Sequence, residues 1–194
     1  MGWNRNAVKC FCKVLSHIIY RVKIEGLENI PDEGGAILCP NHLHAFDSVV
    51  LGSHIKRMVY AMAKEELFKT KFKNEFMTAM GCFPVKRGAG GEEAVKKSIN
   101  ILNSKDLLII FPEGTRNGMA KGVRPKKGAA LIALKSQVPI IPVGINGTFK
   151  FLSKITIKIG KPIDLSEYYA EEQTTETLQQ IMDNVMGEVV KLSK

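Results

Sequence analysis

Short apolar runs alternate along the chain with longer segments whose apolar residues recur at helical spacing. The short runs predict buried strands, at Ala36–Cys39, Met58–Ala63, Cys82–Val85, Leu107–Phe111, Ile140–Ile145 and Ile155–Ile159. The longer segments predict helices, at Asp47–Lys56, Glu66–Met80, Glu92–Asn103, Lys127–Gln137 and Thr174–Leu192. Strands that take turns with helices indicate an α/β fold with a largely parallel central sheet flanked by helices.

The segment from Trp3 to Tyr20 predicts an amphipathic helix of a different kind. One face is apolar and aromatic, with Trp3, Ala7, Phe11, Val14, Leu15 and Ile18, and the other carries Arg5, Lys9, Lys13 and His17. This composition is typical of a helix that lies in a membrane interface. A terminal helix that packs its apolar face on the core fits the pattern equally well. We expect residues 1–24 to form an amphipathic, membrane-associating segment and residues 25–194 to form one further domain.

Composition narrows the class of protein. A chain of 194 residues that is 45% hydrophobic and 24% charged is globular and long enough to bury a core without disulfides or a structural metal. Its four cysteines include no C-x-x-C pair and follow no cleavable signal pattern, which favours a reduced, cytosolic compartment. The longest apolar runs are far below the roughly 20 residues that cross a bilayer. Membrane contact is therefore expected to be peripheral.

The charge distribution predicts an anionic partner. The formal net charge is +9, and every charged residue from Arg116 to Lys161 is basic. A phosphate ligand, an anionic lipid surface or a nucleic acid would each match such a region. No helix-turn-helix, zinc-finger or RNA-binding signature accompanies it, so nucleic acid is not expected.

One candidate for proton transfer follows the first predicted strand. His42 lies just beyond that strand, and Asp47 lies five residues further on, near a helix start. A carboxylate that accepts a hydrogen bond from Nδ1 leaves Nε2 as a general base. Asp47 as a simple helix cap, with His42 as a loop residue, is the alternative.

A second candidate follows the apolar strand that ends near Phe111. The turn Pro112–Arg116 reads Pro-Glu-Gly-Thr-Arg, and it combines backbone amides, a hydroxyl and a guanidinium. A guanidinium fork suits phosphate oxygens, and a glycine allows them a close approach to the backbone. An ordinary turn with an exposed arginine is the alternative.

Four segments together resemble a known family. Asn41-His42 with Asp47, Gly81–Arg87, Phe111–Arg116 and Val138–Val143 are similar, in order, to the four sequence blocks of the glycerophospholipid acyltransferases. The likeness runs from about Val22 to about Asp164, with bacterial members that acylate lysophosphatidic acid the most similar. Pro84 and Asn117 depart from the usual residues of the blocks. The resemblance implies an acyltransferase domain over residues 25–194.

The resemblance also implies a reaction. His42 would be the general base and Asp47 its orienting partner. The sn-2 hydroxyl of lysophosphatidic acid would attack the thioester of acyl-CoA or acyl-carrier protein directly, without a cofactor, a metal or an acyl-enzyme. Glycerol-3-phosphate or another lysophospholipid is the alternative acceptor. The expected location is the cytoplasmic face of the cell membrane, on an anionic surface. The sequence makes no prediction of oligomeric state.

The same resemblance assigns residues to the acceptor's phosphate. Lys126 and Lys127 precede a predicted helix, and Lys127 is the expected ligand, whereas Lys126 is as consistent with a surface lysine. The full set expected to bind the phosphate or shape its pocket is Arg87, Glu113, Gly114, Thr115, Arg116 and Lys127.

Several alternatives remain open. Cys39 or Ser48 would be the nucleophile of a covalent mechanism. A metal site would use His42, His44, His54, Asp47 and Glu113, but their spacing is not that of a metal motif. Phe68, Phe72 and Phe76 share one helix face and either pack on the sheet or contact acyl chains or membrane. A non-catalytic binder of anionic lipid is the alternative of another class.

Overall fold

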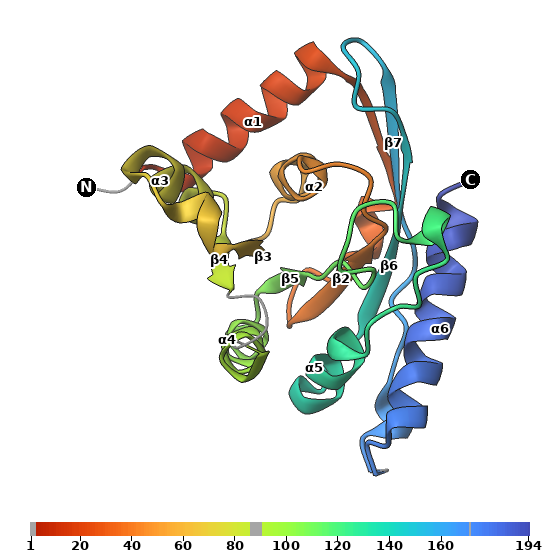
Figure 1. Cartoon of the computed structure of the whole chain (residues 1–194). Coiled ribbons are helices and arrows are strands. Elements are labelled where there is room, and N and C mark those ends of the chain that lie inside the picture. Colours follow the sequence, from red (N-terminus) through yellow and green to blue (C-terminus); the bar gives the residue numbers. More distant parts are fainter. Residues whose placement is uncertain (1–2, 86–90, 171) are drawn as a thin grey trace.

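The computed structural model describes residues 3–85, 91–170 and 172–194, and within these residues one seven-stranded sheet forms the centre of the molecule (Figure 1). Its strand order is β1-β7-β6-β2-β5-β3-β4. The strands are β1 (Arg21–Glu25), β2 (Ala36–Pro40), β3 (Val59–Lys64), β4 (Cys82–Val85), β5 (Leu107–Ile109), β6 (Ile140–Gly147) and β7 (Lys154–Ile159). Only β6 and β7 pair antiparallel. The predicted α/β fold with a largely parallel sheet is confirmed.

Burial on both faces explains why the central strands are continuous apolar runs. Every residue of β2 is buried, and its side chains alternate between the two faces of the sheet, so that Leu38 and Ile37 join different core clusters. The edge strand β1 has no counterpart among the predicted strands. Its residues are alternately exposed and half-buried, and this short segment pairs in parallel with β7.

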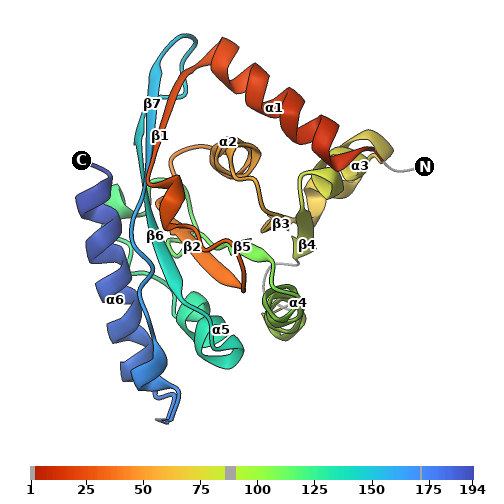
Figure 2. The same ribbon diagram turned by 180° about the vertical axis from the view of Figure 1, so that it is seen from behind.

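Helices cover both faces of the sheet (Figure 2). One side holds α1 (Arg5–Ile19), α2 (Asp47–His54) and α3 (Lys71–Ala79), and the other holds α4 (Gly91–Asn103), α5 (Gly128–Ser136) and α6 (Thr175–Leu192). The helix predicted over Glu66–Met80 is divided, because Thr70 caps the start of α3 and a short 3-10 turn, η2 (Glu65–Phe68), precedes it. None of the described helices combines the length and the apolar composition needed to cross a membrane.

Helix α1 turns its apolar face away from the protein. Its inner face includes Cys12 and Lys9, whose ammonium group donates to the carbonyl oxygens of Ile55 at 2.7 Å and Arg57 at 3.1 Å. The outer face leaves large apolar side chains exposed, namely Phe11, Val14, Leu15 and Ile18. The sequence left two orientations open, and the structure has the one in which the apolar face does not pack on the core.

The loops that carry the predicted chemistry meet at one edge of the sheet. Strands β2, β5 and β6 are neighbours or near neighbours that run in the same direction, so their carboxyl ends share that edge. Residues 41–46 follow β2, residues 110–118 follow β5, and the β6–β7 turn follows β6. Ligands of open α/β sheets bind at this edge. Arg87 follows β4 and lies outside the described residues.

Candidate active site

His42 and Asp47 form the hydrogen-bonded pair that their spacing predicts. Nδ1 of His42 lies 2.8 Å from Oδ2 of Asp47, and the side chain of Asp47 is fully buried while that of His42 is one-fifth exposed. A carboxylate only accepts hydrogen bonds, so the proton of the neutral imidazole resides on Nδ1. Nε2 is left with a lone pair. The imidazole stacks on the ring of Phe111 at a centroid distance of 4.1 Å, which fixes its plane.

Asp47 also shapes the loop that holds the imidazole. The same Oδ2 atom accepts the backbone amides of Leu43 at 2.7 Å and His44 at 2.8 Å. Asp47 is the first residue of α2, so the loop turns around a carboxylate that the helix holds in place. The alternative of a simple helix cap is wrong, because Phe46 is the N-cap residue of α2 and the amides that Asp47 binds lie before the helix.

Glu113 is a buried carboxylate that lies between two loops of the site. It is buried, its Oε1 accepts the amide of His42 at 2.7 Å, and its Oε2 accepts the amide of Met119 at 2.6 Å. Gly118 makes room for this carboxylate, because a Cβ there would lie 2.7 Å from Oε2. Both oxygens of Glu113 are engaged, so this carboxylate ties the loop after β2 to the turn after β5.

Hydrogen bonds of two asparagines, Asn117 and Asn41, fix the backbone around His42. The amide of Asn117 donates to the carbonyl oxygen of His42 at 2.6 Å, and Asn117 adopts a left-handed φ of 56°. Asparagine tolerates that conformation better than most residues. The buried side chain of Asn41 donates to the carbonyl of Ile145 and accepts its amide, at 2.9 and 2.6 Å. The loop is therefore fixed to β6 and to the turn after β5, a role that sequence reasoning did not assign to Asn41.

The turn after β5 exposes Gly114, Thr115 and Arg116 above the buried Glu113. Within the described residues, no hydrogen bond or ion pair engages the guanidinium of Arg116. Gly114 has a φ of 62°, and a Cβ there would lie 2.8 Å from the ammonium nitrogen of Lys126. The side chain of Lys126 therefore lies across the turn, directly beside the residues expected to bind phosphate.

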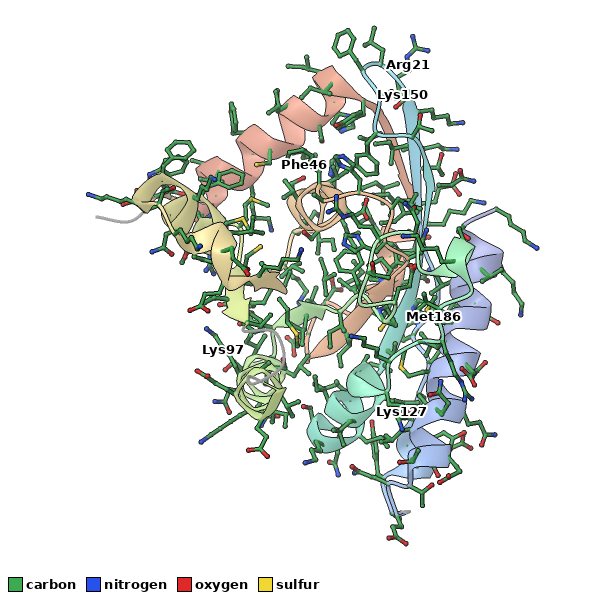
Figure 3. All side chains as sticks on the ribbon, in the orientation of Figure 1. Arg21, Phe46, Lys97, Lys127, Lys150 and Met186 are labelled. Carbon is green, nitrogen blue, oxygen red and sulfur yellow. The ribbon has the colours of Figure 1, made fainter. Side chains whose placement is uncertain are left out.

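Lys127 points elsewhere. It is the N-cap residue of α5, and it lines a hollow with Arg124, Gln179 and Asp183 on the side of α6. Figure 3 shows Lys127 between α5 and α6. The structure thus brings Lys126, and not Lys127, to the exposed turn. Lys126 precedes the N-cap, and its amide donates to the carbonyl of Pro112 at 2.8 Å, which holds this residue against the turn.

The covalent alternative finds little support in the position of Cys39. This thiol is fully buried within the core cluster that α5 and α6 cover, and burial raises its pKa far above the ordinary range. Such a group stays a thiol and does not act as a nucleophile. Among the described residues, no group of three or more His, Cys, Asp and Glu side chains is arranged to hold a metal ion.

An aromatic stack joins the loop after β2 to the β6–β7 turn and to the end of α1. The imidazole of His44 stacks on Phe149 at 4.7 Å, and Phe149 contacts Tyr20 edge-on at 5.4 Å.

At the opposite end of α1, Trp3 contacts Phe72 at 5.0 Å. An apolar hollow of about 570 Å³ lies there between α1 and α3. Phe68 and Phe76 pack partly on the core, whereas Phe72 is exposed.

Comparisons with known proteins agree with this arrangement. The family model described as Acyltransferase matches residues 21–146. The 1-acyl-sn-glycerol-3-phosphate acyltransferase of Bacillus subtilis (strain 168) is 31% identical over 163 residues, which cover 80% of this chain and 80% of that protein. The protein of the same name from Borreliella burgdorferi is 30% identical over 186 residues, or 89% of this chain and 74% of that protein.

A solved structure shares the fold. The crystal structure of the 1-acyl-sn-glycerophosphate (LPA) acyltransferase PlsC from Thermotoga maritima superposes with a TM-score of 0.74 at 28% sequence identity. The match covers 97% of this chain and 79% of that chain.

Proposed function

The chain belongs to the Acyltransferase family, and on that premise we propose that it transfers an acyl group to the sn-2 hydroxyl of 1-acyl-sn-glycerol-3-phosphate. The product is phosphatidic acid, and the donor is the thioester of CoA or of acyl-carrier protein. The relatives of similar length carry the name of this activity. Support from the molecule itself comes from one edge of the sheet, where an oriented imidazole lies beside unpaired cationic side chains.

His42 is the general base of the proposed reaction. Asp47 holds the proton of the imidazole on Nδ1, so Nε2 accepts the proton of the acceptor hydroxyl. The negative charge of Asp47 then stabilises the imidazolium that forms. Because the acceptor oxygen is itself the nucleophile, the mechanism needs no side-chain nucleophile, no metal and no cofactor.

The proton returns in the second half of the reaction. The hydroxyl oxygen bonds to the carbonyl carbon of the thioester, and a tetrahedral oxyanion forms. Its collapse breaks the C–S bond and releases the thiolate. The imidazolium of His42 then gives its proton to the departing sulfur, which completes an ester and a free thiol.

The phosphate of the acceptor binds above the turn after β5 in this proposal. Arg116 supplies a planar fork for two phosphate oxygens, and Lys126 supplies a point charge beside Gly114. Thr115 and Gly114 shape the pocket, and Arg87 stays a proposed ligand from its sequence block. We assign to Lys126 the contact first expected of Lys127, since Lys126 lies across the turn.

The proposed reaction takes place at a membrane surface. The outer face of α1 exposes Phe11, Val14 and Ile18, and an apolar hollow opens between α1 and α3. A helix of this kind lies in the interface of a bilayer, with its apolar side chains among the acyl chains. We propose peripheral binding to anionic lipid, on the cytoplasmic face of the cell membrane.

The observation that carries this proposal is the 2.8 Å contact between His42 and Asp47 at the edge shared with Arg116 and Lys126. The test supplies purified protein with acyl-CoA or acyl-carrier-protein thioester. The acceptors are lysophosphatidic acid, glycerol-3-phosphate and lysophosphatidylcholine, and His42→Ala is the control. We expect phosphatidic acid from lysophosphatidic acid with the unmodified protein alone.

The other outcomes separate the alternatives. Product from glycerol-3-phosphate or lysophosphatidylcholine alone would replace the acceptor and keep the reaction. If folded protein that still binds anionic vesicles forms no product from any pair of donor and acceptor, the non-catalytic lipid binder is favoured. Arg116→Ala should raise the KM for lysophosphatidic acid, while Lys135→Ala, in the last turn of α5 and away from Lys126, serves as the matched control for loss of one positive charge.

A further inference from the structure

The turn between β6 and β7 presents the most exposed large apolar side chain of the described residues. We define the β6–β7 tip as residues 148–153. Phe151 is 74% exposed and Leu152 is 50% exposed, although both are large and apolar. We propose that the β6–β7 tip inserts Phe151 and Leu152 into an anionic lipid bilayer, next to the active site.

The conformation of the tip holds these two side chains outward. Leu152 has a φ of 57°, a left-handed backbone that is unfavourable for leucine and that glycine or asparagine would adopt more easily. Leu152 nevertheless stays 50% exposed, so burial within the protein offsets only part of that cost. An apolar side chain kept there at that cost points to a contact outside the molecule.

Hydrogen bonds make the tip a fixed structure. The hydroxyl of Ser153 donates to the carbonyl of Thr148 and accepts the amide of Lys150. The amide of Leu152 donates to the carbonyl of Ile19 at 2.7 Å, at the end of α1. The tip is therefore fastened to α1 and needs little ordering when it enters a bilayer.

The position of the tip extends the exposed face of α1. Ile18 is 61% exposed and lies one residue before the carbonyl that Leu152 binds. Figures 1 and 2 both show the tip beside the last turn of α1. A helix of 15 residues is about 22 Å long, so the outer face of α1 and the tip form one long apolar ridge. A continuous row of exposed apolar side chains is the arrangement by which interfacial helices bind a bilayer.

The charges around the tip match anionic lipid headgroups. Arg21, Lys150 and Lys154 are exposed near it, and Figure 3 shows Arg21 and Lys150 beside the tip. No acidic residue occurs between Arg116 and Lys161. Basic side chains next to exposed apolar ones are the combination that binds an anionic bilayer surface.

The tip also connects the bilayer to the catalytic loop. Phe149 belongs to the tip, and its ring stacks on His44, whose amide is held by Asp47. When the tip lies in the headgroup layer, the loop that carries His42 lies at that surface. A lipid acceptor then reaches His42 without leaving the bilayer. This inference rests on the proposed function and adds to it the place where the lipid enters.

The first test measures partitioning onto vesicles of phosphatidylglycerol and phosphatidylcholine by sedimentation. We expect Phe151→Ala combined with Leu152→Asn to weaken partitioning about tenfold. The control for Leu152→Asn is Leu27→Asn, because Leu27 is also an exposed leucine but lies outside the ridge. Leu27→Asn should leave partitioning unchanged. Because asparagine tolerates a left-handed φ, Leu152→Asn should keep or raise the melting temperature, so a weaker partitioning will not reflect unfolding.

A second measurement reports insertion directly. Phe151→Trp in a Trp3→Phe background places the only tryptophan at the tip. We expect its emission to shift to the blue on addition of the anionic vesicles and to be quenched by brominated lipid. Emission that stays that of a tryptophan in water would overturn the proposal.

Three further outcomes would also overturn it. The first is partitioning of the double variant equal to that of the unmodified protein. The second is an equal loss for Leu27→Asn. The third is a double variant that partitions normally but transfers acyl groups more slowly from acyl-carrier protein, while its rate from acyl-CoA is unchanged. That result would show that the tip binds an acidic carrier protein. Acyl transfer by the unmodified protein to detergent-dispersed lysophosphatidic acid needs no bilayer, so it tests the proposed function separately.

Discussion

At the edge of the sheet that carries His42, polar side chains are buried, whereas on the outer face of α1 and at the β6–β7 tip apolar side chains are exposed. Asn41, Asp47 and Glu113 are nearly inaccessible to water, and each accepts backbone amides. Phe11 and Ile18 are more than half exposed. Both regions invert the usual distribution of residues.

The buried polar side chains and the exposed apolar side chains have different physical consequences. Buried acceptors fix the loop around His42 because an unpaired amide in the interior would cost free energy, so the imidazole is held in one orientation. Exposed apolar residues gain nothing in water and are stabilised only by an apolar surrounding outside the protein. Helix α6 confirms that the chain is able to bury an amphipathic helix, since Met182 and Val185 of α6 are fully inaccessible.

The largest expected effect is at the buried carboxylate of the catalytic edge. Asp47→Asn keeps the shape of the side chain and one oxygen for the three groups that Oδ2 binds, but it removes the negative charge that stabilises the imidazolium. We expect kcat to fall about 10³-fold with little change in KM. Steady-state kinetics with detergent-dispersed acceptor measure this, and a variant with normal kcat would exclude Asp47 as the orienting partner.

The next expected effect compares the same exchange on two helices. Ile181 of α6 is 3% exposed and Ile18 of α1 is 61% exposed. Ile181→Ser should lower the free energy of unfolding by about 3 kcal/mol, because a buried side chain is lost and a hydroxyl takes its place. Ile18→Ser should change it by less than about 0.5 kcal/mol. Urea unfolding measures both, and equal losses would show that the outer face of α1 is buried in solution.

A smaller effect is expected at Glu113. Gln has one oxygen, whereas the carboxylate serves the amides of both His42 and Met119, so Glu113→Gln leaves one buried amide facing an NH₂ group. We expect the unfolding free energy to fall by about 1–3 kcal/mol. In kinetics, kcat should fall while the KM for lysophosphatidic acid stays close to normal. A raised KM with normal kcat and normal stability would return Glu113 to the phosphate pocket.

The smallest expected effect is a pH dependence of the contact between α1 and α2. Nε2 of His54 lies 3.1 Å from Nε2 of His17, and burial, with the nearby His17 and Lys13, lowers the pKa of His54 despite its bond to the carbonyl of Val50. A base whose folded-state pKa is lowered binds fewer protons when folded, so stability falls as the pH drops below the unfolded value of about 6.5.

His54→Gln provides the comparison for that prediction. The loss of melting temperature between pH 7.5 and pH 5.5 should be smaller in His54→Gln than in the unmodified protein. Identical losses of melting temperature in the two proteins would show that His54 does not make the stability of the α1–α2 contact depend on pH.

Much of the fold follows from local patterns. The continuous apolar run of β2 and the helical spacing of α6 each lie within a residue of their predicted bounds, because burial on one or two faces leaves a periodic trace in the chain. Strand β1 leaves a weak trace. It is a short edge strand with half-buried Val22 and Ile24, and only its pairing with β7 makes it a strand.

The α/β class, the amphipathic helix over residues 3–20, the loop positions of His42 and Arg116 after strands and the place of Asp47 at a helix start all follow from the sequence alone. Tertiary structure alone decided which way α1 turns its apolar face, that Lys126 and not Lys127 reaches the exposed turn, and that Glu113 binds amides. Periodicity records that a helix has two faces, but not which of them meets the protein. That choice depends on contacts between residues far apart in the chain, such as Lys9 with the carbonyl of Ile55 and Leu152 with that of Ile19.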